Sequence, residues 1–456
     1  MPIAASRVAS ISDPVMGQMV LAFLLLIAIA HLFGQLAGKI RQPRIIGEIA
    51  AGIVLGPSIL GRLAPGVSAH IFGAGGADPR GVVLGFLYNL GLLLLMFVSG
   101  AAVRHVMGGE NRRPTIILFA VGTTAPFLLA LGLAGYLPLG RMMGPAGSRS
   151  ALMLIIAAAV AVTSIPVITK IFSDLGILHT RFASLMLGSA VMEDIALWGI
   201  ATIATAIASA SASEGRLSHV IVVHILWNSG YVLVAMTLMP RVLRWLGHAR
   251  WNVLAQRSQI TWVMTVLFGY TAFAAAHSVN LAFAAFLAGY GIVGGFRSTE
   301  RNHYRLSLDS ISTVASGVFV PVYFAIIGFK LDFTKTFSPL MVVAFLVGSS
   351  VVHMLCLAGA ARTAGFRRRA IFNLAVTSNA RGGPGIVLAG VAFDARIINA
   401  SFFTTLVLTA VLTSQVCGWW LERQLRAHKP LLGDDEAFEW AWTDEPEHTA
   451  AALTGA

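Results

Sequence analysis

A run of apolar residues at positions 184–210 contains two adjacent carboxylates, Glu193 and Asp194. The run is long enough to cross a bilayer, which requires about 20 apolar residues. With a rise of about 1.5 Å per residue, Glu193 lies about 14 Å from Ser184, near the middle of a hydrocarbon core about 30 Å thick. An acid at that depth costs at least about 2.5–3.5 kcal/mol to insert. The pair therefore predicts a site for an ion or a proton.

The composition extends this inference to the whole chain. Of its 456 residues, 57% are hydrophobic and 11% are charged, whereas a soluble domain has about 25% charged residues. We therefore expect an all-α polytopic membrane protein embedded in the lipid bilayer. The net charge of +12 does not indicate a nucleic-acid partner, because the basic residues fall in short loops between apolar segments.

Thirteen apolar segments are candidate membrane spans. They are residues 14–38, 45–60, 82–103, 114–138, 150–178, 184–210, 219–243, 258–279, 281–296, 307–331, 338–366, 370–398 and 401–425. Lys and Arg number 18 in and beside the loops after odd-numbered spans, and 8 in those after even-numbered spans. Because positively charged loops stay in the cytoplasm, we predict a protein of the cytoplasmic membrane with its N-terminus outside and its C-terminus inside.

The two ends of the chain are predicted to flank a membrane domain of residues 14–425. Residues 1–13 would form a short extracytoplasmic segment, and the acidic residues 426–456 a cytoplasmic tail that is expected to be disordered. The sequence has no metal-ligand spacing, Walker loop or nucleophile motif. Neither an enzyme nor a bound cofactor is therefore predicted.

Two predicted spans are interrupted near their middles. The fifth contains Thr163-Ser-Ile-Pro166, where the proline removes a helix hydrogen bond. The twelfth contains Thr377-Ser-Asn-Ala-Arg-Gly-Gly-Pro-Gly385, which no continuous helix accommodates. Interrupted spans at corresponding positions of two halves indicate a transporter's binding site. We therefore expect spans 1–6 to repeat, inverted, as spans 8–13, with span 7 as linker.

Asp194 is the strongest candidate for an ion-binding residue. Beside the two breaks it would face backbone carbonyls and the oxygen atoms of Thr163, Ser164 and Asn379, which suit a small monovalent cation. A proton and a cation that compete for one carboxylate would be coupled in their movements. The alternative is a carboxylate that is merely satisfied by a neighbouring hydroxyl or arginine.

Glu193 and Arg381 leave more than one role open. Adjacent helix residues point about 100° apart, so Glu193 cannot face the same ligand as Asp194 equally. It is either a second proton carrier, a partner for a cationic side chain, or the acceptor of a structural hydrogen bond. Arg381 is expected to brace the crossing helices rather than to contact the ion.

Several segments between residues 20 and 425 carry a family resemblance. They are Gln42-Pro-Arg-Ile-Ile-Gly-Glu48, Ala51-Gly-Ile-Val-Leu-Gly-Pro-Ser58, Ala284-Ala-Phe-Leu-Ala-Gly289, Val320-Pro-Val-Tyr-Phe-Ala-Ile-Ile-Gly328, Glu193-Asp194 and Arg381-Gly382. Together they resemble the motifs of the monovalent cation:proton antiporter superfamily, in its bacterial Kef/NapA-type sodium/hydrogen exchanger branch.

The resemblance implies a thirteen-helix antiporter fold of the NhaA/NapA type, in which spans five and twelve cross at the ion site. It implies a homodimer whose dimerisation part is formed by spans 1–3 and 8–10. Spans 4–6 and 11–13 would form an ion-binding core that moves like an elevator. Asp194 would bind the ion.

Three positions depart from the family pattern. Glu193 stands where relatives have Asp, Asn or Gln; there Asp accompanies charge-moving exchange and Asn electroneutral exchange, so the stoichiometry stays open. His353 stands where many relatives have lysine. Because histidine titrates near neutral pH, we expect pH-sensitive activity, with His353 pairing with Glu193 when no cation is bound. Gly383-Pro384 replaces the acid after Arg-Gly, so Arg381 either lacks its salt bridge or pairs with another acid.

The leading functional prediction is a secondary antiporter that exchanges Na+ or K+ for H+. A gated potassium efflux protein of the Kef type is the alternative. It is disfavoured because a nucleotide-binding regulatory domain would need over about 100 residues and a Gly-rich fingerprint, which the sequence lacks. A membrane sensor that does not transport is disfavoured by the carboxylate and both helix breaks.

Overall fold

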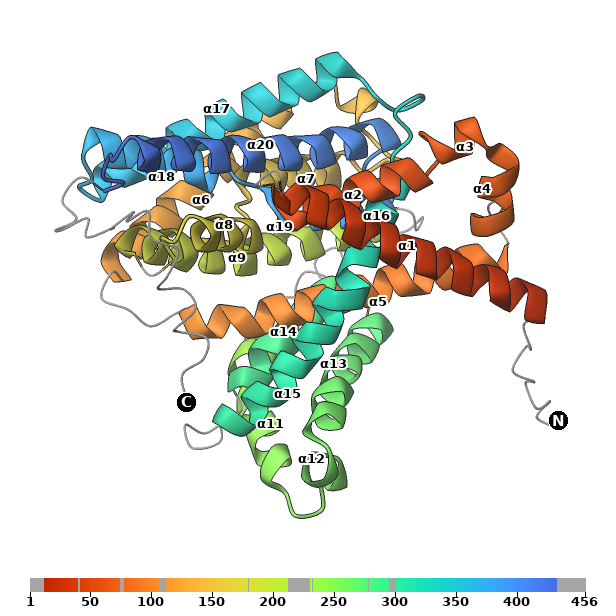
Figure 1. The fold of residues 1–456 in the computed structure, drawn as a ribbon. Helices are drawn as coiled ribbons and strands as arrows, with labels where there is room; N and C mark the ends of the chain where they lie inside the picture. The colour runs from red at the N-terminus through yellow and green to blue at the C-terminus, as the bar shows by residue number, and fades with distance from the viewer. Residues whose placement is uncertain are drawn as a thin grey trace, which may run out of the picture.

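The computed structural model describes residues 12–39, 42–73, 78–106, 112–178, 180–211, 230–231, 233–277, 279–294 and 301–432. Apart from one isolated bridge, all regular structure in these ranges is helical (Figure 1). The elements are α1 (Asp13–Lys39), α2 (Arg44–Leu55), α3 (Leu60–Leu63), α4 (Pro65–Phe72), α5 (Pro79–Val106), α6 (Arg112–Ala134), a 3₁₀ turn (Leu139–Arg141), α7 (Arg149–Ala161), α8 (Ile165–Asp174), α9 (Arg181–Ser211), α11 (Met239–His248), α12 (Val253–Arg257), α13 (Gln259–Ala276), α14 (Leu281–Gly294), α15 (Arg301–Val314), a π-helical turn (Ala315–Phe319), α16 (Val320–Phe329), α17 (Pro339–Thr363), α18 (Arg368–Ser378), α19 (Gly382–Asp394) and α20 (Ala400–Arg426).

The predicted all-α membrane class is confirmed in the described part of the chain. Nine helical segments there are long and apolar enough to cross a membrane, and Arg149–Ala161 and Leu281–Val293 are shorter apolar helices. The predicted spans other than the seventh coincide with a helix or a pair of helices. Residues 219–229 and 232 of the seventh (219–243) lie outside the described residues, so the count of thirteen stays a prediction.

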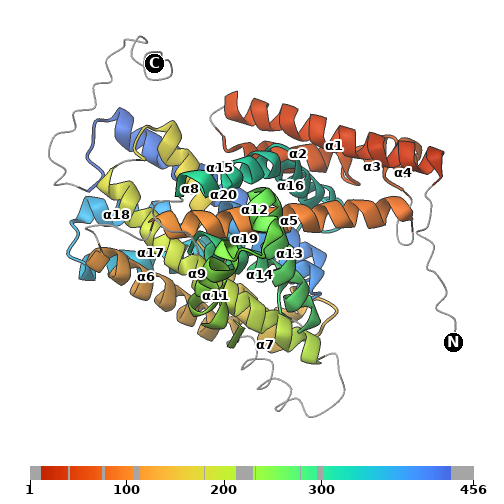
Figure 2. The same ribbon diagram turned by 90° about the horizontal axis from the view of Figure 1, so that it is seen from below.

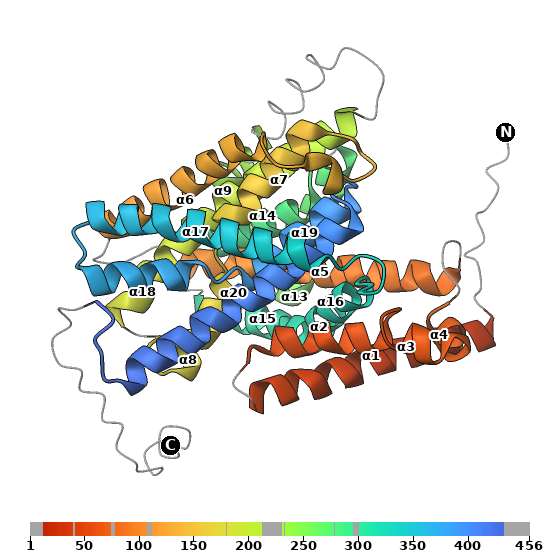
Figure 3. The ribbon, with the colours of Figure 1, turned by 90° about the horizontal axis from the view of Figure 1, so that it is seen from above.

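The helices pack in two groups. In the first group, α1, α2, α5, α13, α14 and α16 contact one another. In the second group, α6, α7, α8, α9, α17, α18, α19 and α20 contact one another. Figure 3 shows α1 to α4 on one side of the molecule and α6, α17 and α18 on the other. The predicted roles of spans 1–3 and 8–10 as a dimerisation part and of spans 4–6 and 11–13 as an ion-binding core stay predictions.

Glycines allow the helices of the first group to touch backbone to backbone. A Cβ atom on Gly52 of α2 would lie 1.8 Å from the Ala325 carbonyl oxygen of α16. One on Gly100 of α5 would lie 1.9 Å from the Phe286 carbonyl oxygen of α14. Small residues at helix contacts are the usual means of close association within a membrane. These helices of the first group therefore pack with their backbones in direct contact.

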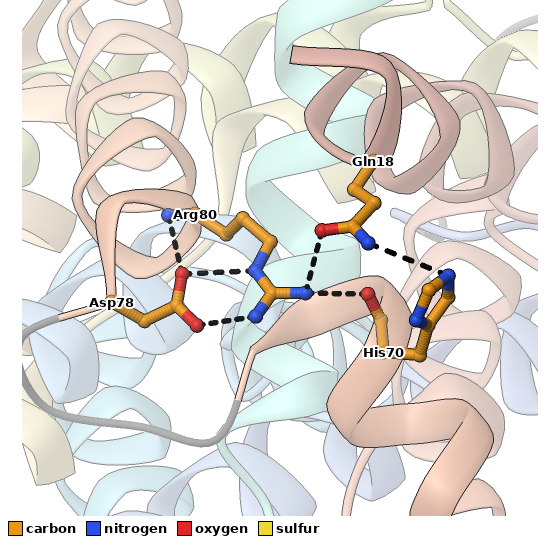
Figure 4. A network of polar contacts seen from close by, with 4 residues as sticks. All are labelled: Gln18, His70, Asp78 and Arg80. Atoms are coloured by element: carbon orange, nitrogen blue, oxygen red, sulfur yellow. Dashed lines mark hydrogen bonds and ion pairs between the residues drawn. The ribbon is translucent and has the colours of Figure 1, made fainter. Parts of the chain in front are cut away.

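An arginine-centred network ties the first group together at one end (Figure 4). Arg80, at the start of α5, forms an ion pair with Asp78, and its Nε donates to Asp78 Oδ1 at 2.9 Å. Its Nη1 donates to Gln18 Oε1 of α1 at 3.1 Å and to the His70 carbonyl oxygen of α4. The network therefore links α1, α4 and α5 at the end where α1 begins.

The predicted tail departs from the expectation of disorder in its first residues. Leu431 and Leu432 are buried, and Asn373 Nδ2 of α18 donates to the Leu431 carbonyl oxygen at 3.0 Å. Their burial and this hydrogen bond hold the short segment against α18. The rest of the predicted tail (433–456) and residues 1–11 of the predicted N-terminal segment lie outside the described residues.

Candidate ion-binding site

The fifth predicted span is broken where its sequence indicates. α7 ends at Ala161, residues 162–164 are not helical, and α8 begins at Ile165. Ser164 Oγ accepts a hydrogen bond from the Val167 N–H at 3.4 Å and so caps the start of α8. The break exposes carbonyls at the end of α7 and N–H groups at the start of α8, which carry partial charges of opposite sign.

The twelfth predicted span is broken in the same manner. α18 ends at Ser378 and α19 begins at Gly382, whose φ is +25°. A Cβ atom on Gly382 would lie 2.2 Å from Val167 Cγ2 and 2.7 Å from Ser164 Oγ. Only glycine therefore allows this break to approach the first one. The Gly382 N–H donates to Ser414 Oγ of α20 at 3.1 Å.

The two breaks are hydrogen-bonded to each other. The Ser164 N–H donates to the Ala380 carbonyl oxygen at 2.7 Å, and Thr163 Oγ1 donates to the Ser378 carbonyl oxygen at 2.7 Å. In Figures 1, 2 and 3, α8 and α18 lie toward one end of the molecule, and α7 and α19 lie further toward the other. The interrupted helices therefore cross at their breaks.

The acidic pair lies on α9, which packs against α7, α8, α18 and α19. Glu193 is 5% exposed and Asp194 is 3% exposed. Glu193 Oε2 accepts a hydrogen bond from Thr123 Oγ1 of α6 at 3.4 Å, and the Thr163 hydroxyl and N–H lie close to the carboxyl, although Glu193 Oε1 has no hydrogen-bond partner among the described residues. Glu193 is therefore the member of the pair that contacts the first break.

Asp194 is buried without a complete set of partners. Its Oδ1 atom has no hydrogen-bond partner among the described residues. An ionised carboxylate in such surroundings is costly unless a proton or a cation neutralises it. The chemistry of Asp194 is therefore that of a group able to hold either a proton or a monovalent cation.

The polar residues predicted at the breaks gather at the crossing, but their hydrogen bonds do not run to Asp194. Thr163 Oγ1 donates to the Ser378 carbonyl oxygen, and Ser164 Oγ accepts from the Val167 N–H. Asn379 Nδ2 donates to Ser350 Oγ of α17 at 3.0 Å, and its Oδ1 accepts from Arg381 Nη2 at 3.1 Å. Each of their oxygen atoms has a second lone pair, which a cation could use.

Arg381 braces the second break, as its position predicts. Its side chain is 2% exposed, and Nη1 donates to Ser349 Oγ of α17 at 2.6 Å. Among the described residues no carboxylate forms a salt bridge with it. Arg381 therefore donates to two neutral oxygen acceptors, on Ser349 and Asn379. They take the role of the acid that the family pattern has where this chain has Gly383-Pro384.

His353 has a different partner from the predicted one. Its Nε2 lies 3.1 Å from Ser378 Oγ, and that hydroxyl donates to the Ala375 carbonyl oxygen at 3.0 Å. The serine oxygen therefore accepts, and Nε2 carries the proton. The structure does not show the predicted pair with Glu193: His353 of α17 contacts Ser378 of α18, whereas Glu193 accepts a hydrogen bond from Thr123 of α6.

Sequence reasoning missed Thr123, Ser349 and Ser378. Each is a hydroxyl residue inside a predicted span, which is a weak signal that a partner is needed. Many other hydroxyls in these spans bond only to their own helix, as Thr202 Oγ1 does to the Trp198 carbonyl oxygen at 2.9 Å. The residue type alone therefore could not select the three that belong to the crossing.

A cavity of about 1030 Å³ lies at one end of the molecule. Its wall includes the end of α1, the start of α2, the end of α8 and the second half of α20. The basic residues in this wall are Lys39, Arg44, Lys170 and Arg426. Ser414, which accepts the hydrogen bond from Gly382, also lines it. The cavity therefore comes close to the second break at Ser414, although none of its lining residues belongs to either break or to the acidic pair.

Comparison with known proteins agrees with this geometry. Residues 22–427 match the family described as sodium/hydrogen exchanger, transmembrane. The chain is 24% identical to the Na(+)/H(+)-K(+) antiporter GerN of Bacillus cereus, over 86% of this chain and 92% of GerN. It is also 24% identical to the Na(+)/H(+) antiporter NhaS4 of Synechocystis, over 86% of this chain and 93% of NhaS4.

The fold is similar to that of the sodium proton antiporter MjNhaP1 from Methanocaldococcus jannaschii. The TM-score is 0.59 at 14% sequence identity, over 91% of this chain and 97% of that one. The family resemblance of the sequence motifs is thus confirmed. The chain belongs to the sodium/hydrogen exchanger family of transmembrane antiporters.

Proposed function

We propose that the protein exchanges Na+ or K+ for H+ across the cytoplasmic membrane, with Asp194 carrying the cation in one direction and the proton in the other. The observation that carries this proposal is the buried, incompletely partnered Asp194 on α9, the helix that packs against both broken helices. The exchange reactions named for GerN and NhaS4 support the class of transport.

The same burial explains why cation and proton movement would be coupled. An ionised carboxylate that crosses the hydrocarbon core alone costs at least about 2.5–3.5 kcal/mol. A penalty of that size slows the unloaded transition by about 100-fold. The carboxylate therefore crosses with a cation or with a proton, and either occupant must leave before the other binds.

Glu193 is proposed to hold the first break rather than the transported cation. Its contacts with Thr123 and Thr163 support this role. If Glu193 keeps its proton throughout the cycle, one cation exchanges for one proton; if it also releases a proton, each cycle moves a net charge. The residue thereby sets the stoichiometry.

Access to Asp194 is proposed to alternate by an elevator movement. The second group of helices would slide against the first, which would also form the interface of a homodimer. The basic wall of the cavity supports a cytoplasmic assignment for that end, since Lys and Arg concentrate on the cytoplasmic side. The N-terminus would then lie outside, and the structure would represent a form that is open toward the cytoplasm.

The test is transport by the purified protein in liposomes that contain a pH-sensitive dye. With the membrane potential clamped, added Na+ or K+ is expected to move protons in the opposite direction. Potassium flux without proton movement would instead indicate the Kef-type efflux protein. If no alkali cation causes proton movement, the exchange function is rejected.

A further inference from the structure

We propose that Lys330 and Asp394 form a gate at the end of the molecule opposite the cavity, and that this gate sets how readily the ion site opens there. The inference rests on the proposed exchange function. Lys330 Nζ lies 2.8 Å from Asp394 Oδ1, as a hydrogen-bonded ion pair. Lys330 directly follows α16 of the first group, and Asp394 is the last residue of α19 of the second group. The pair therefore bridges the two groups.

The stacked rings of Tyr88 and Tyr323 in the first group, here called the aromatic shelf, support the ion pair. Lys330 Nζ lies 3.7 Å from the centroid of the Tyr88 ring of α5, a cation–π contact. Tyr88 stacks on Tyr323 of α16, with ring centroids 5.0 Å apart. A Cβ atom on Gly390 of α19 would lie 2.8 Å from the Tyr88 hydroxyl oxygen and 3.5 Å from that of Tyr323.

Gly390 and Asp394 lie on the same face of α19, the face that packs against the shelf. Residues four apart lie on one face of a helix, so the glycine seats α19 against the two rings while the acid reaches Lys330. Both tyrosine hydroxyls are buried, and that of Tyr88 lies close to the Tyr323 hydroxyl and to the Asp394 carboxylate.

The Lys330–Asp394 pair lies at the end of the molecule opposite the cavity. α20 begins beside the pair's end of the molecule, where Thr404 Oγ1 lies 2.9 Å from Thr336 Oγ1. This helix of 27 residues ends at Arg426, in the cavity wall, and is about 40 Å long. α19 runs the 13 residues from the second break to Asp394, about 20 Å. Movement at the crossing is therefore transmitted to the pair by one straight half-helix.

The strength of the gate suits a contact that is broken in every cycle. The side chains are 27% and 41% exposed, and ion pairs and cation–π contacts with such access to solvent are weak. Together they favour the structure described here over the oppositely open form by about 3- to 10-fold. A bias of this size favours one form but still allows the protein to change between the two forms in every cycle.

The experiment compares Lys330→Met and Asp394→Asn with Lys335→Met, a control for the loss of one lysine from the same segment. The half-saturating cation concentration is measured separately on each face of oriented proteoliposomes. We expect the gate variants to lower it by about 3- to 10-fold on the face opposite the cavity, because the outward-open form becomes more populated. The value on the cavity face should change little, and Lys335→Met should match the parent on both faces.

A second readout does not require transport. Gln415 lines the cavity, and a Gln415→Cys reporter reacts with a membrane-impermeant thiol reagent when the cavity is open. We expect Lys330→Met to slow this labelling by about 2-fold, and the charge-swapped pair Lys330→Asp/Asp394→Lys to restore it. A parent protein that labels but does not exchange would reject the proposed function while the labelling still tests the gate.

Equal changes on both faces, together with labelling that the gate variants leave unaltered, would overturn the proposal. Such a result would show that the pair only stabilises the fold. If Lys330→Met does not yield folded protein, Asp394→Asn carries the same test, since it preserves the shape of the side chain.

Discussion

The backbone N–H of Ser164 donates a 2.7 Å hydrogen bond to the Ala380 carbonyl oxygen, and this bond joins the two helix breaks. It pairs a donor freed by one interruption with an acceptor freed by the other, where hydrocarbon surroundings offer neither group a water molecule. Thr163 makes a parallel link to Ser378. Each break thus stabilises the other, and a change in either one is expected to reach the ion site.

The Thr163 hydroxyl is expected to contribute to both folding and cation binding. Thr163→Val preserves the shape of the side chain but leaves the Ser378 carbonyl oxygen without its donor, which costs about 1–3 kcal/mol. We expect a lower thermal midpoint in lipid and a smaller stabilisation by added cation. Thr265→Val is the matched control, because Thr265 Oγ1 bonds only to its own helix, at the Thr261 carbonyl oxygen. Equal behaviour of the two variants would contradict the role of the crossing bond.

Arg381 and Ser349 are expected to be energetically coupled. Their 2.6 Å contact is buried and charge-assisted, and polar contacts within membranes contribute less than their burial suggests. A double-mutant cycle with Arg381→Gln and Ser349→Ala should give a coupling of about 1–2 kcal/mol in the free energy of unfolding. Additive single effects would mean that the guanidinium takes its support from elsewhere.

His353→Gln tests the corrected position of the histidine. Glutamine can still donate to Ser378 Oγ, so the variant should remain stable and keep the pH dependence of exchange. His353→Ala, which removes the donor, should lower stability by about 1–3 kcal/mol. The pH profile of initial exchange rates is the measurement. A displacement of the His353→Gln profile by a whole pH unit would show that the histidine does pair with a titrating group during the cycle.

Competition at one carboxylate has a defined pH signature. Lowering the pH on the loading face increases proton occupancy, so the half-saturating cation concentration should rise, by at most about tenfold per pH unit. The maximal rate at saturating cation should change far less. Initial rates at several cation concentrations and pH values measure both quantities. A half-saturating concentration that does not depend on pH would indicate separate sites for cation and proton.

The helix breaks could be predicted because their causes are local. Pro166 and the Gly382–Gly385 cluster interrupt a helix whatever surrounds them. The depth of Glu193 and Asp194 could also be predicted, since it follows from counting along an apolar run.

The partners of these residues could not be predicted, because they come from spans far apart in the chain. Thr123 of α6 bonds to Glu193, and Ser349 of α17 bonds to Arg381. The contact of His353 with Ser378 could not be predicted for the same reason. Its depth within its span was apparent from the sequence, but whether it faces α9 or α18 depends on how α17 is rotated within the bundle.

Exchange by Asp194→Asn tests the central claim most directly. The variant keeps the size of the side chain and removes its charge, so cation-driven proton movement in dye-loaded liposomes should disappear. Asp309→Asn, at an exposed position of α15, is the matched control and should exchange at the rate of the parent. Sustained Na+/H+ or K+/H+ exchange by Asp194→Asn would contradict the assignment of Asp194 as the shared carboxylate.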